Sequence, residues 1–204
     1  LWMGNVRGEE MKRVERNVVE GEMDDGDLLP DIYDVLNGLQ KSQDGSYFFY
    51  PAEIKLTPSY NIIYDLYCIE VDKKEAEPIK LASDICSYSV LKNNHILYVD
   101  KECRFCICDI NGNEEEISSD YLQWYKLSID EKTLIYVTSL GMYHVDMQTP
   151  RESEKLDLDV TAIVAASDSL DMIIYKKEGG LYVLKDLSKR EKIAEGTANV
   201  SVLN

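Results

Sequence analysis

The sequence predicts an all-β fold, a β-propeller of four-stranded antiparallel blades, and three observations lead to this prediction. A pattern of two short apolar runs recurs along the chain about every 38 residues. Turn-forming residues separate the runs at strand-like intervals, and tyrosine, which favours strands, outnumbers phenylalanine by 14 to 3. Four strands repeating at nearly 40 residues is the pattern of a propeller blade.

The repeat is clearest in the last three copies, which run over 88–120, 125–159 and 164–196. The first marker of each copy lies in its second strand, and the spacings are 38 and 39 residues for Tyr98, Tyr136 and Tyr175. The second marker lies in the third strand, and the spacings are 37 and 39 residues for Cys106, Tyr143 and Tyr182. Because the spacings of the two markers stay nearly equal from copy to copy, both markers belong to one repeated structural unit.

An earlier copy has its markers at 47–50 and 66–69, with about ten additional residues between them. Residues 1–3 and 11–14 resemble the third and fourth strands of a copy, and 199–202 resemble a first strand. The expected division is therefore a split blade (1–19 and 198–204) and four full blades (35–85, 86–122, 123–160 and 161–197). If the two ends pair, the ring closes and the chain is a monomer. An open piece of a larger ring would instead expose blade edges and favour a dimer.

Two turns carry a family resemblance. The segments 128–136 (SIDEKTLIY) and 42–50 (SQDGSYFFY) resemble the S-P-D-G-K-x-L-x-Y hairpin of TolB-like, WD40-like propeller repeats. The second halves of the copies are similar to uncharacterised propeller domains of Gram-positive bacteria. The resemblance covers about residues 35–204 and implies a bacterial propeller. No proline occupies the second hairpin position, and the copies at Val90 and Ser167 lack the Asp-Gly pair. We expect Asp44 and Asp130 to cap turn amides and not to be catalytic.

The charge balance narrows the range of partners. The chain has 22 Lys and Arg residues against 38 Asp and Glu residues, a net charge of −16. Such a chain repels phosphate backbones, so nucleic acid and direct membrane insertion are not expected. Acidic surfaces also simply favour solubility. No apolar run reaches the roughly 20 residues of a membrane span, and no signal peptide is present.

Two features bear on the cellular compartment. Because the chain starts at Leu1, we expect it to be trimmed or cut from a longer protein. Its five cysteines are an odd number in a domain that is not small, which favours a reducing, cytoplasmic setting. The family resemblance also allows an extracytoplasmic domain.

Two expected loops, 20–34 and 51–65, are longer than the repeat requires and project from the same side of the first full blade. Long insertions on one side often form a binding site. The first loop is acidic, and its candidate ligand-binding residues are Asp24, Asp25, Asp27 and Asp31. Its oxygens suit calcium or a basic partner, although the spacing does not match an EF-hand. The alternative is a solvated acidic loop.

The second expected loop contributes Tyr60 and Tyr64 as candidate ligand contacts, because tyrosine is enriched in interfaces. The alternative is that both tyrosines cover the core of the blade.

Metal and catalytic motifs are weak. The run Cys103, Cys106 and Cys108 invites a zinc interpretation, but Cys106 and Cys108 occupy packing positions of the repeat. No second cysteine pair or nearby histidine completes a site, so no metal site is predicted there. His95 and His144 stand beside no nucleophile motif, and we expect both to be structural.

The sequence therefore predicts a non-enzymatic binding or scaffolding propeller with no cofactor and with a protein, peptide or glycan ligand. One alternative is a carbohydrate-active enzyme resembling glycoside hydrolases, with acids facing the channel. The predicted first strands, which would line that channel, carry almost no Asp or Glu. Another alternative is an extracytoplasmic sensor domain.

Overall fold

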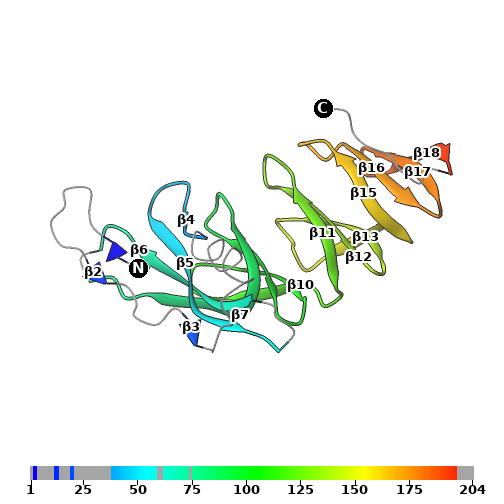
Figure 1. Ribbon diagram of the computed structural model, residues 1–204. Helices are drawn as coiled ribbons and strands as arrows, with labels where there is room; N and C mark the ends of the chain where they lie inside the picture. The colour runs from blue at the N-terminus through cyan, green and yellow to red at the C-terminus, as the bar shows by residue number, and fades with distance from the viewer. Residues whose placement is uncertain are drawn as a thin grey trace. The chain divides into compact units, whose positions relative to one another are not determined.

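The computed structural model contains only β-strands over the residues that it describes, which are 38–58, 62–73 and 75–196 and three short strands before them (Figure 1). None of these residues forms a helix long and apolar enough to cross a membrane. The chain divides into two compact units, Leu1–Lys101 with Cys108–Glu114, and Glu102–Ile107 with Glu115–Asn204.

The strands follow one another in chain order as β1 (Trp2–Met3), β2 (Lys12–Arg13), β3 (Val19–Glu20), β4 (Gln40–Lys41), β5 (Tyr47–Leu56), β6 (Ile62–Glu70), β7 (Ile79–Val90), β8 (Ile96–Asp100), β9 (Phe105–Cys108), β10 (Glu114–Ser118), β11 (Leu122–Leu127), β12 (Thr133–Thr138), β13 (Gly141–Asp146), β14 (Ser153–Asp157), β15 (Val160–Ala166), β16 (Met172–Lys177), β17 (Gly180–Lys185) and β18 (Lys189–Glu195).

The second unit contains two four-stranded antiparallel sheets, β11–β14 and β15–β18, in which consecutive strands are neighbours. The repeat markers have a structural meaning in these sheets. Tyr136 lies opposite Tyr143, and Tyr175 lies opposite Tyr182. Their rings stack with centroids 5.0 Å and 5.7 Å apart. Each of these two sheets thus carries one cross-strand tyrosine stack between its second and third strands.

Strands β3 to β8 of the first unit belong to a sheet of order β10-β9-β8-β7-β6-β5-β3, with β4 also paired to β5, while most of β9 and β10 belongs to the second unit. The long strand β7 pairs with β6 through its first part and with β8 through its second part. The expected blade boundary between residues 85 and 86 therefore lies within β7, where the register shifts between Ile85 and Ser87. The stack recurs here, since Tyr50 lies opposite Tyr67 with ring centroids 5.9 Å apart.

The ends expected to form a split blade are described only in part. Strands β1 and β2 pair with each other antiparallel, and β3 pairs parallel with β5. The expected first strand at 198–204 lies outside the described residues.

The expected loop over 51–65 is wrong. Strand β5 continues to Leu56 and β6 begins at Ile62, so that most of this segment is a paired hairpin. Pro51 lacks the N–H group that a paired strand residue can donate. The structure tolerates it next to a bulge between Ala52 and Lys55, where Glu53 has a φ of 50°. Pairing resumes beyond the bulge, and Ile54 on the continued strand is only 3% exposed.

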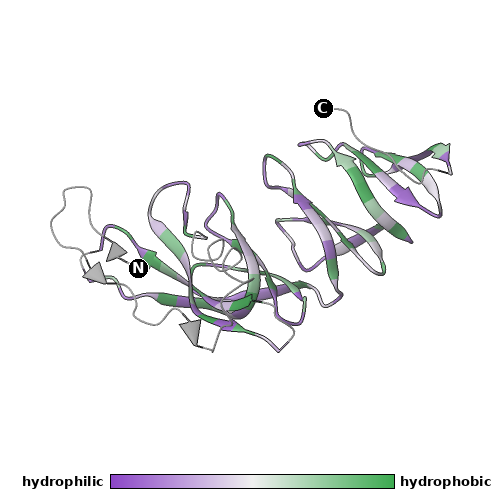
Figure 2. Ribbon diagram, in the orientation of Figure 1, coloured by the Kyte–Doolittle hydropathy of each residue, from purple (hydrophilic) through white to green (hydrophobic). Residues whose placement is uncertain are grey.

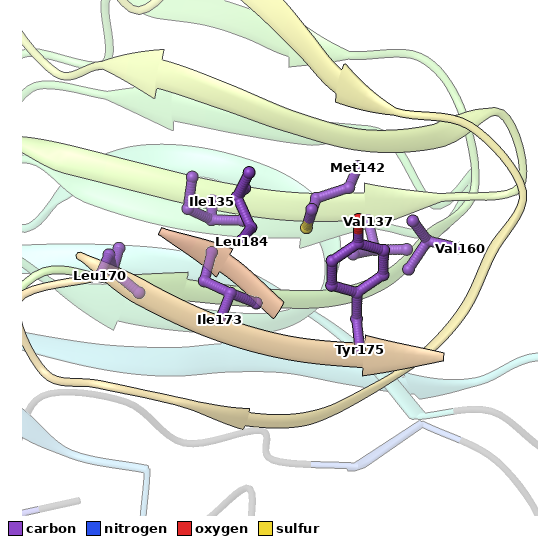
Figure 3. Close-up of a cluster of buried hydrophobic side chains, with 8 residues drawn as sticks. All are labelled: Ile135, Val137, Met142, Val160, Leu170, Ile173, Tyr175 and Leu184. Atoms are coloured by element: carbon purple, nitrogen blue, oxygen red, sulfur yellow. The ribbon is translucent and has the colours of Figure 1, made fainter. Parts of the chain in front are cut away.

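An apolar core joins the two sheets of the second unit (Figure 3). It is formed by fully or nearly fully buried side chains from both sheets, namely Ile135, Val137, Met142, Val160, Leu170, Ile173, Tyr175 and Leu184. In Figure 2 most of the strongly hydrophobic segments lie on strands, which also carry hydrophilic segments. Short apolar runs in the sequence thus correspond to strands buried between stacked sheets.

The first hairpin of three copies is built around a serine. The side-chain oxygens of Ser42, Ser128 and Ser167 accept the backbone N–H of the residue five positions later, at 2.9, 3.0 and 3.1 Å. The serine hydroxyls in turn donate to Asp44, Asp130 and Asp171. Asp44 and Asp130 also accept a turn amide, from Ser46 and Lys132. The prediction that Asp44 and Asp130 cap turns is confirmed.

Replacing Ser128 by alanine is expected to lower the free energy of unfolding by about 1–2 kcal/mol. Ser128 is 4% exposed, so the Thr133 amide would lose its acceptor away from water. Chemical denaturation measures this cost. Ser139→Ala, in the exposed turn that follows β12, is the matched control and should change stability little. Equal costs for the two variants would contradict the capping role.

Candidate functional site

Five of the six predicted ligand-contacting residues lie outside the described residues, namely Asp24, Asp25, Asp27, Asp31 and Tyr60. The sixth, Tyr64, lies in β6 with 5% of its surface exposed. Its ring meets the edge of Tyr88 with centroids 6.3 Å apart, and burial raises the pKa of its hydroxyl. Tyr64 is therefore part of the core, and its contact with a ligand stays a prediction.

Buried charged side chains lie near strand ends on the side from which the sequence analysis expected the long loops to project. Within each unit, we call the connection side the side on which the second strand of a repeat copy turns into the third and one copy leads to the next. In the first unit, the side chain of Asp65 is 2% exposed and forms an ion pair with Lys80. It also accepts the N–H of Asp84 at 3.0 Å. Burial alone would raise the pKa of Asp65, but these hydrogen bonds and the Lys80 charge lower it.

A second carboxylate, Asp84, lies in β7 with a φ of 51°. It accepts hydrogen bonds from Lys55 at 3.2 Å and Lys101 at 2.7 Å, which lower its pKa. Nearby, Glu53 accepts the Tyr67 hydroxyl at 2.9 Å. A positive φ in a non-glycine residue costs about 1–3 kcal/mol and often accompanies functional sites. Glu53 and Asp84 both have one, so the strands bend where the charges meet.

The second unit has its own buried carboxylate on the connection side. Asp157 ends β14, and its side chain is 3% exposed. It accepts hydrogen bonds from the Tyr175 hydroxyl at 2.5 Å and from Lys177 at 2.8 Å. Arg190 lies 2.9 Å away, and the N–H of Leu158 donates at 2.7 Å. Burial would raise the pKa of Asp157, but these donors and cations lower it.

These carboxylates share one chemical character. The pKa of Asp65, Asp84 and Asp157 is lowered in each case. A general acid working near neutral pH needs a carboxyl group with a raised pKa. The three carboxylates are therefore fixed anions held by lysine and arginine, which suits structural support.

Each of the two histidines lies near a polar group of its own copy of the repeat. His95 Nδ1 lies 3.3 Å from the carbonyl oxygen of Asn93, and His144 Nδ1 lies 3.8 Å from Glu154. Within the described ranges, no group of three or more His, Cys, Asp or Glu residues is placed to hold a metal ion. The acidic loop considered for calcium lies outside those ranges.

The cysteines are free thiols. Cys106 and Cys108 are 0% and 1% exposed in β9, so the prediction that they are packing residues is confirmed. Cys68 is equally buried in β6, and burial raises its pKa to about 11. Its thiol is protonated at neutral pH and is a poor nucleophile.

The connection side of the second unit also exposes apolar side chains that sequence reasoning missed. Tyr121, Leu140 and Leu158 are 62%, 53% and 49% exposed. Each lies just outside a strand, so in the sequence it merges with the apolar run that it adjoins. Only the strand ends distinguish these three residues from core residues.

Neither a protein-family model nor a curated protein matches the chain. Among solved structures, an oligogalacturonate lyase from Vibrio parahaemolyticus is similar over 81% of this chain and 55% of its own, at a TM-score of 0.52 and 11% identity. A putative TolB from Agrobacterium tumefaciens is similar over 78% and 61%, at 0.46 and 14%.

Both solved proteins are β-propellers. The likeness to the lyase shows a propeller-like fold for this chain, and at this identity it shows the fold alone. The chain spans less than two thirds of the length of either protein.

Proposed function

We propose that this chain is part of a non-enzymatic β-propeller that binds a partner on its connection side. The observation that carries the proposal is the state of three carboxylates there, of which Asp65 and Asp157 are buried and Asp84 is partly exposed. Asp65, Asp84 and Asp157 are each held as anions by cationic side chains. This favours a rigid support for a binding surface over acid–base catalysis, because a surface held in place needs little reorganisation on binding.

The remaining features extend the proposal. Binding residues concentrate on turns that a rigid scaffold holds in place. The predicted acidic loop with Asp24, Asp25, Asp27 and Asp31 would add negative charge to the same side, for a basic partner or calcium. In this proposal four blades and a split closing blade form one ring, and the chain is a monomer. The ligand belongs to the protein, peptide or glycan classes.

A carbohydrate-active enzyme is the competing function, because one protein of similar fold is an oligogalacturonate lyase. A lyase cleaves by elimination and leaves an unsaturated product. The purified chain, incubated with oligogalacturonate with and without divalent cations, is expected to form none. A saturable rate of product formation by the chain would overturn the proposal.

Binding itself is tested by applying the labelled chain to arrays of immobilised peptides and glycans. Spots bound by the chain should weaken in Asp159→Lys/Glu178→Lys, which reverses two exposed charges on the connection side. The control is Glu152→Lys, an exposed acid in the turn at the opposite ends of the strands. Equal loss in both variants would contradict binding on the connection side. Light scattering of the same sample should give a mass near 23.4 kDa.

A further inference from the structure

Three large apolar side chains lie in water at one end of the sheet β11–β14. Tyr121 immediately precedes β11, Leu140 lies in the turn from β12 to β13, and Leu158 immediately follows β14. Their exposures of 62%, 53% and 49% are high for residues of this type. We call them the apolar row.

The strand register places these residues side by side. Leu122 pairs with Thr138, so Tyr121 lies at the end where β12 leads into the turn with Leu140. Met142 pairs with Asp157 at the same end. A Cβ atom added to Gly141 would lie 3.5 Å from the Cα of Leu158, which shows how closely that turn approaches the connection. The row spans four neighbouring strand ends, about 14 Å at the usual strand spacing.

The backbone that presents the row is firmly held. The N–H of Leu140 donates to the Thr138 hydroxyl at 3.1 Å. The N–H of Leu158 donates to Asp157 at 2.7 Å, and Asp157 is itself bound by Lys177 and Arg190. A backbone that is already held in place loses little freedom when the side chains on it contact a partner, which favours an interface over accidental exposure.

The position of the apolar row and the charged residues beside it indicate which kind of partner could bind there. Neighbouring blades of a propeller cover the faces of a sheet and leave the ends of its strands open. Acids flank the row, since Asp120 precedes Tyr121 and Asp159 follows Leu158. The nearby cations Lys177 and Arg190 are both committed to Asp157. A second copy, with a net charge of −16 and the same acids, would be repelled.

We infer that the apolar row binds a basic peptide segment of a partner protein, one that places leucine-like side chains on the row and lysine or arginine against its flanking acids. This inference rests on the proposed binding function and names the surface and the chemical class of the ligand. A row of three side chains is a small interface, so we expect affinity in roughly the micromolar range, weakened by salt.

The test uses fluorescein-labelled peptides in a fluorescence anisotropy titration of the whole chain. A short peptide of alternating lysine and leucine is expected to bind. A lysine–serine peptide should bind at least about tenfold more weakly, and a glutamate–leucine peptide should not bind. If none of them binds, or if the lysine–serine peptide binds equally well, the inference is overturned.

Variants locate the site. Leu140→Ser/Leu158→Ser is expected to weaken binding of the lysine–leucine peptide at least about tenfold. Ile129→Ser removes a side chain that is 70% exposed at the opposite end of the sheet and should leave binding unchanged. Equal loss in both variants would overturn the inference.

Two further outcomes separate this inference from the function on which it rests. If Asp159→Lys/Glu178→Lys abolishes peptide binding while Leu140→Ser/Leu158→Ser does not, the connection side binds but the apolar row is not its contact. If light scattering shows a dimer that Leu140→Ser/Leu158→Ser converts to a monomer, the occupant is a second copy and the inference fails.

Discussion

Asp157→Ala is expected to lower the free energy of unfolding by about 3–5 kcal/mol, because it breaks a buried ion cluster from one side. The side chain of Lys177 is only 16% exposed and would keep its charge without its anion. The Tyr175 hydroxyl would lose its acceptor, and the Leu158 amide would lose its own. Denaturation in urea measures the loss.

A matched pair of variants separates the buried charge from its surroundings. Asp157→Asn keeps the shape of the side chain and removes the charge, so it should cost less than alanine but still more than 1 kcal/mol. Asp159→Asn makes the same change two residues later, at an exposed position, and should stay within about 0.5 kcal/mol of the parent. If the two asparagine variants cost the same, the cluster does not stabilise the fold.

The stabilisation by Asp157 should also depend on pH, in a direction that follows from its pKa. The pKa of Asp157 is lowered in the folded chain. Its contribution to stability is therefore complete above the unfolded value of about 3.9 and is lost as the pH falls through the lower folded value. The stability difference between the parent and Asp157→Asn should shrink as the solution is acidified below that value. A difference that grows on acidification would contradict the assignment.

The strand pattern could be predicted because the repeat is carried by local chemistry. Tyr136 and Tyr143 recur at fixed spacing because each pair stacks across two adjacent strands. Asp130 could be read correctly because its partners, Ser128 and the amide of Lys132, lie within two residues of it. Interactions this short in sequence leave a recognisable motif.

The connection side was harder to predict, because its contacts join residues far apart in sequence. Asp157 forms ion pairs with Lys177 and Arg190, which follow it by 20 and 33 residues. No short sequence motif predicts such a cluster. The bulge after Pro51 was hidden for another reason. A proline often marks the end of a strand. Only the resumed pairing of Leu56 with Ile62 shows that this strand continues. Tyr64 is buried as a consequence.

Gly141→Ala is the second substitution expected to have a large effect, a loss of about 3 kcal/mol or more in the free energy of unfolding. Gly141 begins β13 with a φ of +139°, which L-residues rarely adopt. A Cβ atom there would lie 2.3 Å from the carbonyl oxygen of Asp157, far inside van der Waals contact. That oxygen belongs to a paired strand and cannot move without disturbing the buried cluster at Asp157.

A second glycine distinguishes the cost of the steric contact from the cost of the backbone strain. Gly179 has a φ of +71° in the corresponding turn of the next sheet, and an added Cβ atom would meet nothing within 4 Å. Gly179→Ala should therefore cost only the backbone term, about 1–2 kcal/mol. If Gly141→Ala lowers the free energy of unfolding no more than Gly179→Ala does in the same urea titration, the two strands do not approach each other this closely. Because the clash acts on Asp157, combining Gly141→Ala with Asp157→Asn should cost clearly less than the sum of the two.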